Sequence, residues 1–549
     1  MKKILVLFFL LSASAQAQTN FENLKPLLDQ VQPDSIRRHI AFLADDRMRG
    51  RLPGTPEFQV AIDYIIKHYK MFGMKPGGDK GSFMQAVKLR KARINAAGIS
   101  MELKGASTKA LTFGEDVVLF PHFEEKSTRI TAPLVFAGYG ISAPDMNYDD
   151  FKGIDVKGKI IVIVSGAPDN FPSTIRSHSL GRTTIVQTAI SKGAVGVLYK
   201  TSTNVNLKNL AYAATESGAH VALSPKGIMY YPSYAGGAGM GLKVYGYISN
   251  EVFNSIAGQT EGQMTAIFNG LKNGTPSSFD LNTNATVTYT SNHTDIDSYN
   301  VVGIIEGSDS KLKNEYVVHT AHLDHVGVGT AVKGDSIYNG AHDNASGVAS
   351  TLEVARLYSK LISKPKRSII FVMVTGEEMG MLGSSFFSNF PTVPKKSIVA
   401  NVNMDMPTII APLMAVVPLG APHSTLINQV NNAAGFLGLD VEQDPEPEQN
   451  RFIRSDQYSF VIQGIPALHI KYGDKTSEPG KKLSDDVKVW RADTYHKPQD
   501  QLDTGVFDFN AGKKYVQLNF LISYQVAQET GRPRWNEGDF FGKQFGERK

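Results

Sequence analysis

From about residue 298 onward, short apolar runs alternate with segments of helical character. The apolar runs cover residues 301–305, 316–320, 368–374, 398–402 and 467–470. Helical character appears between them, at 347–361 and again after Gly380. Continuous apolar runs are typical of strands that are buried on both faces, with helices packed on either side. The pattern predicts an α/β fold with a mainly parallel, twisted sheet flanked by helices.

Acidic residues and histidines follow several of these apolar runs. His322 comes after the run at 316–320, the pair Glu377 and Glu378 after 368–374, and Asp405 after 398–402. Ligands of α/β sheets bind at the carboxyl ends of the strands. Taken singly, each residue has an ordinary explanation, such as an acid in the first turn of a helix.

The ordered set is more informative than any one member. It comprises two histidines and three acids, namely His322, Asp343, Glu378, Asp405 and His496. The chain has no cysteine, so a metal site must use His and carboxylates, which suit catalytic zinc. Such a set matches two zinc ions about 3.5–4 Å apart. We predict two Zn²⁺ ions as cofactors, and of the adjacent Glu377 and Glu378 one can bind metal while its neighbour acts as general base.

Five fragments together resemble the motif set of the co-catalytic zinc exopeptidases. This group holds the bacterial leucine-type aminopeptidases and glutamate carboxypeptidase. The fragments are AHLDH, GAHDNASG, TGEEMGMLGS, NVNMDM and YHKPQD. The resemblance covers residues 298–525 and the helices before residue 110. It implies that His322 and Asp405 hold one zinc ion, that Glu378 and His496 hold the other, and that Asp343 bridges both.

The same resemblance implies roles for the residues around the ligands. Glu377 would take a proton from the attacking water and deliver it to the leaving amine. A cis peptide bond is implied between Asp343 and Asn344. Asp324 and Asp500 would orient metal ligands, and the substrate-binding residues would be Arg454, Ser455 and Asp456. Gln457 departs from the family, which often has His there.

The sequence before residue 298 has a different pattern of apolar runs. Val- and Ile-rich runs at 132–139, 159–165 and 193–199 are broken by Gly, Pro and Asn. They indicate a smaller β-rich unit. We predict that residues 126–272 form a protease-associated insert, between an N-terminal part of the peptidase domain at 18–125 and its main part at 273–549. The polar tail after Arg534 is expected to be loosely held.

The N-terminus has the features of a secretory signal. Lys2 and Lys3 precede an apolar run at 4–11, and Ala15-Gln16-Ala17 provides a cleavage site. We predict a signal peptide at 1–17 and an exported protein, periplasmic or secreted, without a membrane anchor. A scattered net charge of +5 on 549 residues indicates neither a nucleic-acid nor a membrane partner.

The resemblance favours an aminopeptidase that acts on peptides. A carboxypeptidase of the glutamate carboxypeptidase type remains open, because Arg451 or Arg454 could bind a free carboxylate. Glutaminyl cyclase chemistry and a catalytically inactive, receptor-like binding protein are further alternatives. The residues do not decide the side-chain preference or the oligomeric state.

Overall fold

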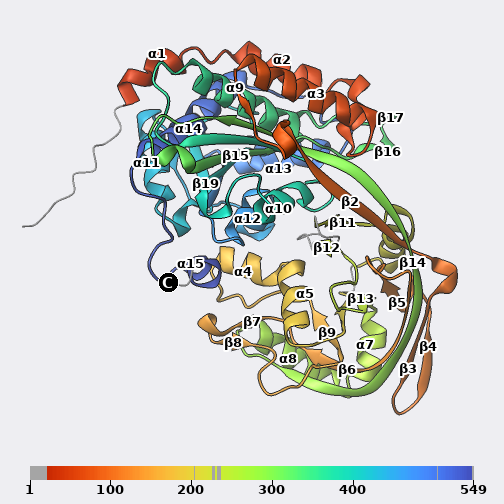
Figure 1. Cartoon of the computed structure of the whole chain (residues 1–549). Coiled ribbons are helices and arrows are strands. Elements are labelled where there is room, and N and C mark those ends of the chain that lie inside the picture. Colours follow the sequence, from red (N-terminus) through yellow and green to blue (C-terminus); the bar gives the residue numbers. More distant parts are fainter. Residues whose placement is uncertain (1–20, 203–204, 225–228, 231–235, 504, 547–549) are drawn as a thin grey trace, which may run out of the picture.

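The computed structural model describes residues 21–202, 205–224, 229–230, 236–503 and 505–546. The predicted signal peptide lies outside the described residues. Figure 1 shows a larger body of sheet and helices and a smaller body beside it. Two long strands, β2 (Met84–Ile94) and β14 (Ser278–Ile305), run between the bodies.

The larger body is built on one mixed sheet. Its central strands β18, β15, β19 and β22 pair in parallel in that order, and antiparallel strands flank them. The strands in spatial order are β2, β14, β18 (Ser368–Val374), β15 (Tyr316–His322), β19 (Ile398–Asn403), β22 (Ala467–Tyr472), β20 (Ala415–Leu419) and β21 (Asp440–Val441). The predicted α/β class with a largely parallel sheet is confirmed.

Helices cover both faces of this sheet. Val317, Ile369 and Phe371 point to one face, and their neighbours Val318 and Ile370 point to the other. The first face packs against α2 (Pro33–Leu43), α3 (Pro56–Met71), α9 (Gly347–Lys360), α11 (Leu426–Phe436) and α14 (Phe509–Gln528). The second packs against α10 (Leu382–Asn389), α12 (Gln457–Val461) and α15 (Phe540–Phe545). Burial on both faces explains why the strands are apolar throughout rather than alternating.

The smaller body has its own sheet and core. Its strands are β3 (Ser100–Lys104), β4 (Thr108–Leu111), β5 (Val117–Leu119), β6 (Ser127–Ala137), β9 (Ile160–Val164), β10 (Gly196–Lys200) and β13 (Val244–Ile248). Helices α4 (Ser173–Leu180), α5 (Arg182–Ser191), α7 (Asn250–Ile256) and α8 (Glu261–Lys272) accompany them. The core extends from Ala92 to Tyr289, beyond the predicted insert at 126–272, because β2 and β14 contribute to it. The insert boundaries stay a prediction.

Short elements complete the described chain. They are α1 (Lys25–Leu28), β1 (Lys75–Pro76), β7 (Ser142–Ala143), β8 (Tyr148–Asp149), α6 (Leu207–Tyr212), β11 (Ala219–Leu223), β12 (Met229–Tyr230), β16 (Gly327–Val332), β17 (Asp335–Tyr338) and α13 (Leu483–Thr494). None of the helices in the described ranges has the length and apolar character needed to cross a bilayer.

Two contacts join α4 of the smaller body to the larger one. Ser177 Oγ donates to Asn450 Oδ1 at 2.8 Å. His178 Nδ1 and the hydroxyl of Tyr458 in α12 form a hydrogen bond. The smaller body therefore contacts the segment that leads to α12.

The C-terminal tail is packed rather than loose, so that expectation is wrong. Phe541 in α15 is fully buried, and Trp535 Nε1 donates to the carbonyl of Gly464 at 3.0 Å. Aromatic side chains hold this segment against the second face of the sheet. The expectation was based on the polar composition of the segment and did not take these aromatic residues into account.

Candidate metal centre

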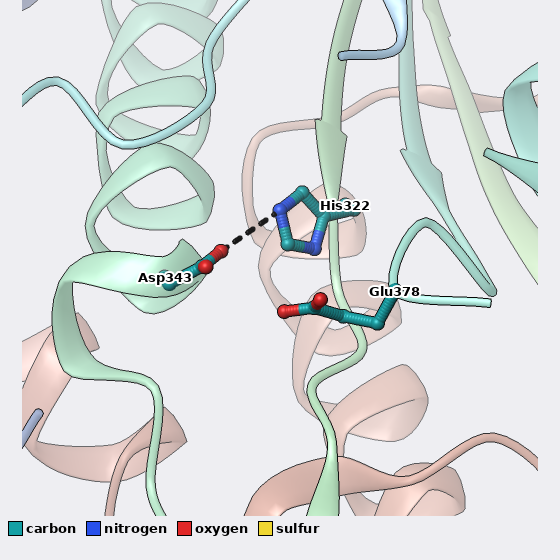
Figure 2. Close-up of side chains that lie close together, drawn as sticks. All are labelled: His322, Asp343 and Glu378. Atoms are coloured by element: carbon teal, nitrogen blue, oxygen red, sulfur yellow. Dashed lines mark ion pairs between the residues drawn. The ribbon is translucent and has the colours of Figure 1, made fainter. Parts of the chain in front are cut away.

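The predicted ligands meet at one edge of the central sheet. His322 is the last residue of β15, and Glu378 lies in the turn after β18. Asp405 follows β19, Asp343 precedes α9, and His496 follows α13. Figure 2 shows the side chains of His322, Asp343 and Glu378 directed into a common space. One ligand atom from each of these three lies within 4.8 Å of the others.

Asp343 occupies the middle of the cluster. Its Oδ1 lies 3.2 Å from His322 Nε2, and its Oδ2 lies 3.2 Å from His496 Nε2. On one side, His322 Nε2 also lies 3.4 Å from Asp405 Oδ1. On the other side, His496 Nε2 lies 3.1 Å from Glu378 Oε2. The two carboxylate oxygens of Asp343 therefore face two separate His–acid pairs, in the grouping that the resemblance implies.

These distances fit zinc. Two ligand atoms that each lie about 2.0–2.1 Å from a tetrahedral zinc ion are roughly 3.3 Å apart. The His–carboxylate separations of 3.1–3.4 Å agree with that spacing. Within the described chain, the buried Oδ1 of Asp405 makes no regular hydrogen bond. Histidine nitrogens and carboxylate oxygens, with no cysteine, are the donors of catalytic zinc sites.

The carboxylates of the two predicted orienting acids bind backbone amides, and the backbone carbonyl of Asp324 also lies 3.1 Å from His322 Nδ1. Asp324 Oδ1 accepts from the amide of Glu377 at 3.1 Å, and Oδ2 accepts from the amide of Glu378 at 3.3 Å. Asp500 Oδ2 accepts from the amide of Asp343 at 3.0 Å. Both carboxylates thus hold the loops that carry the ligands. The cis peptide bond expected between Asp343 and Asn344 is present.

Three further histidines lie in or near the site. His319 is buried in β15 and stacks on Phe371, so it belongs to the core. His325 Nδ1 lies 2.7 Å from Glu378 Oε1 and supports that ligand. His342 stacks on Phe507 with ring centroids 4.0 Å apart. Neither His325 nor His342 is a surface residue.

Arg51 is a structural partner of the site that the sequence did not single out. Its side chain is buried and donates to the carbonyls of Leu323 at 3.0 Å, Asn339 at 2.6 Å and Gly340 at 3.1 Å. It also donates to the carbonyl of Leu43. Leu323 follows His322, and Gly340 precedes Asp343 by three residues, so one guanidinium joins two ligand loops. The sequence signal for this role is the arginine-rich turn before Pro53.

The predicted base is buried close to the ligands. Burial raises the pKa of the Glu377 carboxyl well above its usual range, and the adjacent Glu378 carboxylate raises it further. A carboxyl of raised pKa is suited to accept a proton and release it later.

The predicted substrate residues separate into two groups. Ser455 Oγ donates to Asp405 Oδ2 at 2.6 Å and so contacts a ligand directly. Asp456 is fully buried. Burial raises its pKa to about 7. Arg454, like Ser455, lines a pocket that borders Asp405, and Asp456 is not among the residues that line it.

The fold and donor set are those of an α/β metallohydrolase. Residues 300–512 match the sequence model of Peptidase family M28. The resemblance to co-catalytic zinc exopeptidases is thus confirmed over this stretch, and the matched family is one of zinc-dependent metallopeptidases.

Curated relatives match over shorter stretches. Carboxypeptidase Q of Xenopus laevis is 36% identical over 129 residues, which is 24% of this chain and 24% of the relative. Aminopeptidase NAALADL1 of Mus musculus is 35% identical over 114 residues, 20% of this chain and 14% of the relative. Leupeptin-inactivating enzyme 1 of Streptomyces exfoliatus is 28% identical over 178 residues, 31% of this chain and 34% of the relative. The matches thus span about a third or less of the length of these relatives.

Solved structures match over a longer part of the chain. An aminopeptidase from Aneurinibacillus sp. strain AM-1 covers 92% of this chain and 96% of its own, at 20% identity and a TM-score of 0.49. BSAP, a zinc aminopeptidase from Bacillus subtilis, covers 91% and 97%, at 19% identity and a TM-score of 0.43.

Proposed function

We propose that the chain is an exported exopeptidase that uses two zinc ions to remove residues from the amino end of peptides. The observation that carries the proposal is the position of Asp343 between two His–acid pairs. A single metal site would not need one carboxylate to face both pairs.

The His–carboxylate distances divide the proposed ligands into two groups, one for each zinc ion. His322 and Asp405 would hold one ion, Glu378 and His496 the other, and Asp343 both. When bound, the ions would polarise the scissile carbonyl and stabilise the charge that develops on its oxygen.

Glu377 carries the proton transfer. Its carboxylate takes a proton from the attacking water. It later gives that proton to the nitrogen of the leaving group, so that the shortened peptide departs as a free amine. Its amide is fixed by Asp324, so the residue starts from a defined backbone position. The buried environment keeps competing solvent away from the carboxyl.

The test is Glu377→Gln, assayed with aminoacyl arylamides and by zinc content. We expect zinc to remain while kcat falls by about 10²- to 10⁴-fold, the usual contribution of a general base. His322→Ala should instead lose both zinc and activity. Full activity in Glu377→Gln would exclude the base assignment. A purified protein that takes up no divalent metal would exclude the metal centre.

A second candidate is a carboxypeptidase, and a basic pocket beside Asp405 favours it. Amino-blocked and carboxyl-blocked versions of one peptide separate the two activities. An aminopeptidase cleaves only the peptide with a free amine, and a carboxypeptidase only the peptide with a free carboxylate.

The proposal of export depends on residues 1–17 alone. Expression of the full chain in a Gram-negative host, followed by fractionation and N-terminal sequencing, tests it. We expect a periplasmic or secreted product that begins near Gln18. A cytoplasmic product that retains Met1 would contradict export.

A further inference from the structure

A pocket beside the candidate metal centre is lined by four basic side chains. They are Arg451, Arg454, Lys471 and Arg491. Asp405 and Ser455 lie in the same pocket wall, together with Tyr472 and Tyr495. Since Asp405 is a proposed zinc ligand, a group in this pocket would lie close to the scissile bond.

One of the four charges is balanced within the protein. Arg451 is 7% exposed and pairs with Asp444 through Nη2. Its Nη1 lies 3.2 Å from Glu446 Oε2. These two acids compensate Arg451, so this residue contributes mainly to the shape of the pocket.

Lys471 and Arg491 form hydrogen bonds only to neutral groups. Lys471 Nζ donates to the carbonyls of Asp405 at 2.9 Å and Met406 at 3.0 Å. Arg491 Nη1 donates to Gln449 Oε1 at 2.6 Å, and its guanidinium lies 4.7 Å from the ring centroid of Tyr495. Among the described residues, no carboxylate lies within ion-pair distance of Lys471 or Arg491. Like charges gathered in one pocket repel each other, and an anion relieves that repulsion.

We propose that this pocket binds a carboxylate of the substrate, which Lys471 and Arg491 hold next to the bond that is cleaved. The proposal rests on the proposed function and specifies its substrate class. The carboxylate can come from the side chain of an N-terminal Asp or Glu residue, or from the free C-terminus of the peptide. Charge-assisted hydrogen bonds to either source are the same, and they are stronger than bonds between neutral groups.

Two matched substrate pairs separate the two sources. The first pair is Glu-arylamide and Gln-arylamide, which differ only in the side-chain charge. The second pair is an N-acetylated dipeptide with a free or an amidated C-terminus. We expect kcat/KM to favour the carboxylate member about 10- to 100-fold in one of the pairs, as for a hydrogen bond to a charged group. Ratios near one in both pairs would overturn the proposal.

Variants assign the preference to the pocket. In Arg491→Gln, the favoured ratio should fall about tenfold or more, and Arg491→Lys should retain part of it. Arg534→Gln is the matched control, because Arg534 lies in a different surface pocket and should leave the ratio unchanged. An unchanged ratio in Arg491→Gln with normal zinc content would overturn the pocket assignment.

The two proposals can fail separately. A protein that binds zinc and cleaves Leu-arylamide without preferring a carboxylate contradicts only the pocket. A protein that binds no zinc and cleaves none of the four substrates contradicts the metallopeptidase proposal itself. Thermal unfolding shows whether each variant still folds. If Arg491→Gln does not fold, Lys471→Met provides a second test of the same kcat/KM ratio.

Discussion

Replacement of Arg51 by methionine should destabilise the larger body strongly. Methionine keeps an unbranched apolar stem but removes the charge and all donors. Four buried carbonyls, those of Leu43, Leu323, Asn339 and Gly340, would lose a charged hydrogen-bond partner. The pKa of Arg51 is lowered to about 10 by burial, so the side chain is still protonated at neutral pH.

The magnitude follows from the unsatisfied groups. Each buried polar group that loses its partner costs about 1–3 kcal/mol. At the lower limit, four carbonyls give a loss of about 4 kcal/mol, in the range for breaking a buried charged network. Since about 1 kcal/mol shifts Tm by roughly 2 °C in a domain of about 250 residues, we expect Tm to fall by about 8 °C.

Arg49→Met is the matched control in the same turn. Arg49 has a positive φ of 45°, close to the 46° of Arg51, but its side chain is 57% exposed. Its contact with Glu57 at 3.7 Å is a surface ion pair, which contributes about 0–1 kcal/mol. Calorimetry of both variants is the assay. If Arg51→Met unfolds within about 2 °C of Arg49→Met, the reasoning from buried carbonyls is wrong.

Three further outcomes are expected. Chelation of zinc should lower Tm, and added zinc should restore it. The free energy of unfolding should fall by about 4 kcal/mol if free zinc was 1,000 times its Kd before chelation. An unchanged Tm would contradict a metal site in the folded state. Asp500→Asn should weaken zinc binding about 10- to 100-fold, whereas the exposed Asp503→Asn should not, as measured by competition with a chromogenic chelator. Burial lowers the pKa of His178 to about 4, so its stabilising contribution is present above pH 6.5 and is lost as pH falls toward 4. Between pH 7 and pH 5, His178 should reduce the free energy of unfolding by about 2 kcal/mol. In urea unfolding, His178→Gln should lack this part of the pH dependence. An equal loss of stability in the variant and the wild type would exclude the assignment to His178.

Sequence reasoning succeeded where the information is local. The residues at the end of β15 and after β18 and β19 could be found because a parallel sheet brings the carboxyl ends of its strands to one edge. Thr55 before Pro56 can likewise be recognised as a capping residue at the start of α3, where its side chain accepts from the amide of Phe58. Neither inference needed to know which distant segments pack together.

Long-range packing determines features that local sequence patterns do not show. The 28 residues of β14 pair with strands of both bodies, so the second core does not end where the composition changes. The tail after Arg534 looked loose because its polar residues outnumber the aromatic ones that anchor it. In both cases the partner lies far away in the sequence.

The amino-acid sequence by itself determined the type of sheet and identified the residues that could serve as metal ligands. It did so because strand periodicity and strand-end position are properties of short segments. Only the tertiary structure decided that Asp343 faces two His–acid pairs, that Arg51 joins the ligand loops, and that Lys471 and Arg491 share a pocket. These features depend on distances between groups that are up to 289 residues apart in the sequence, and packing of the whole chain sets those distances.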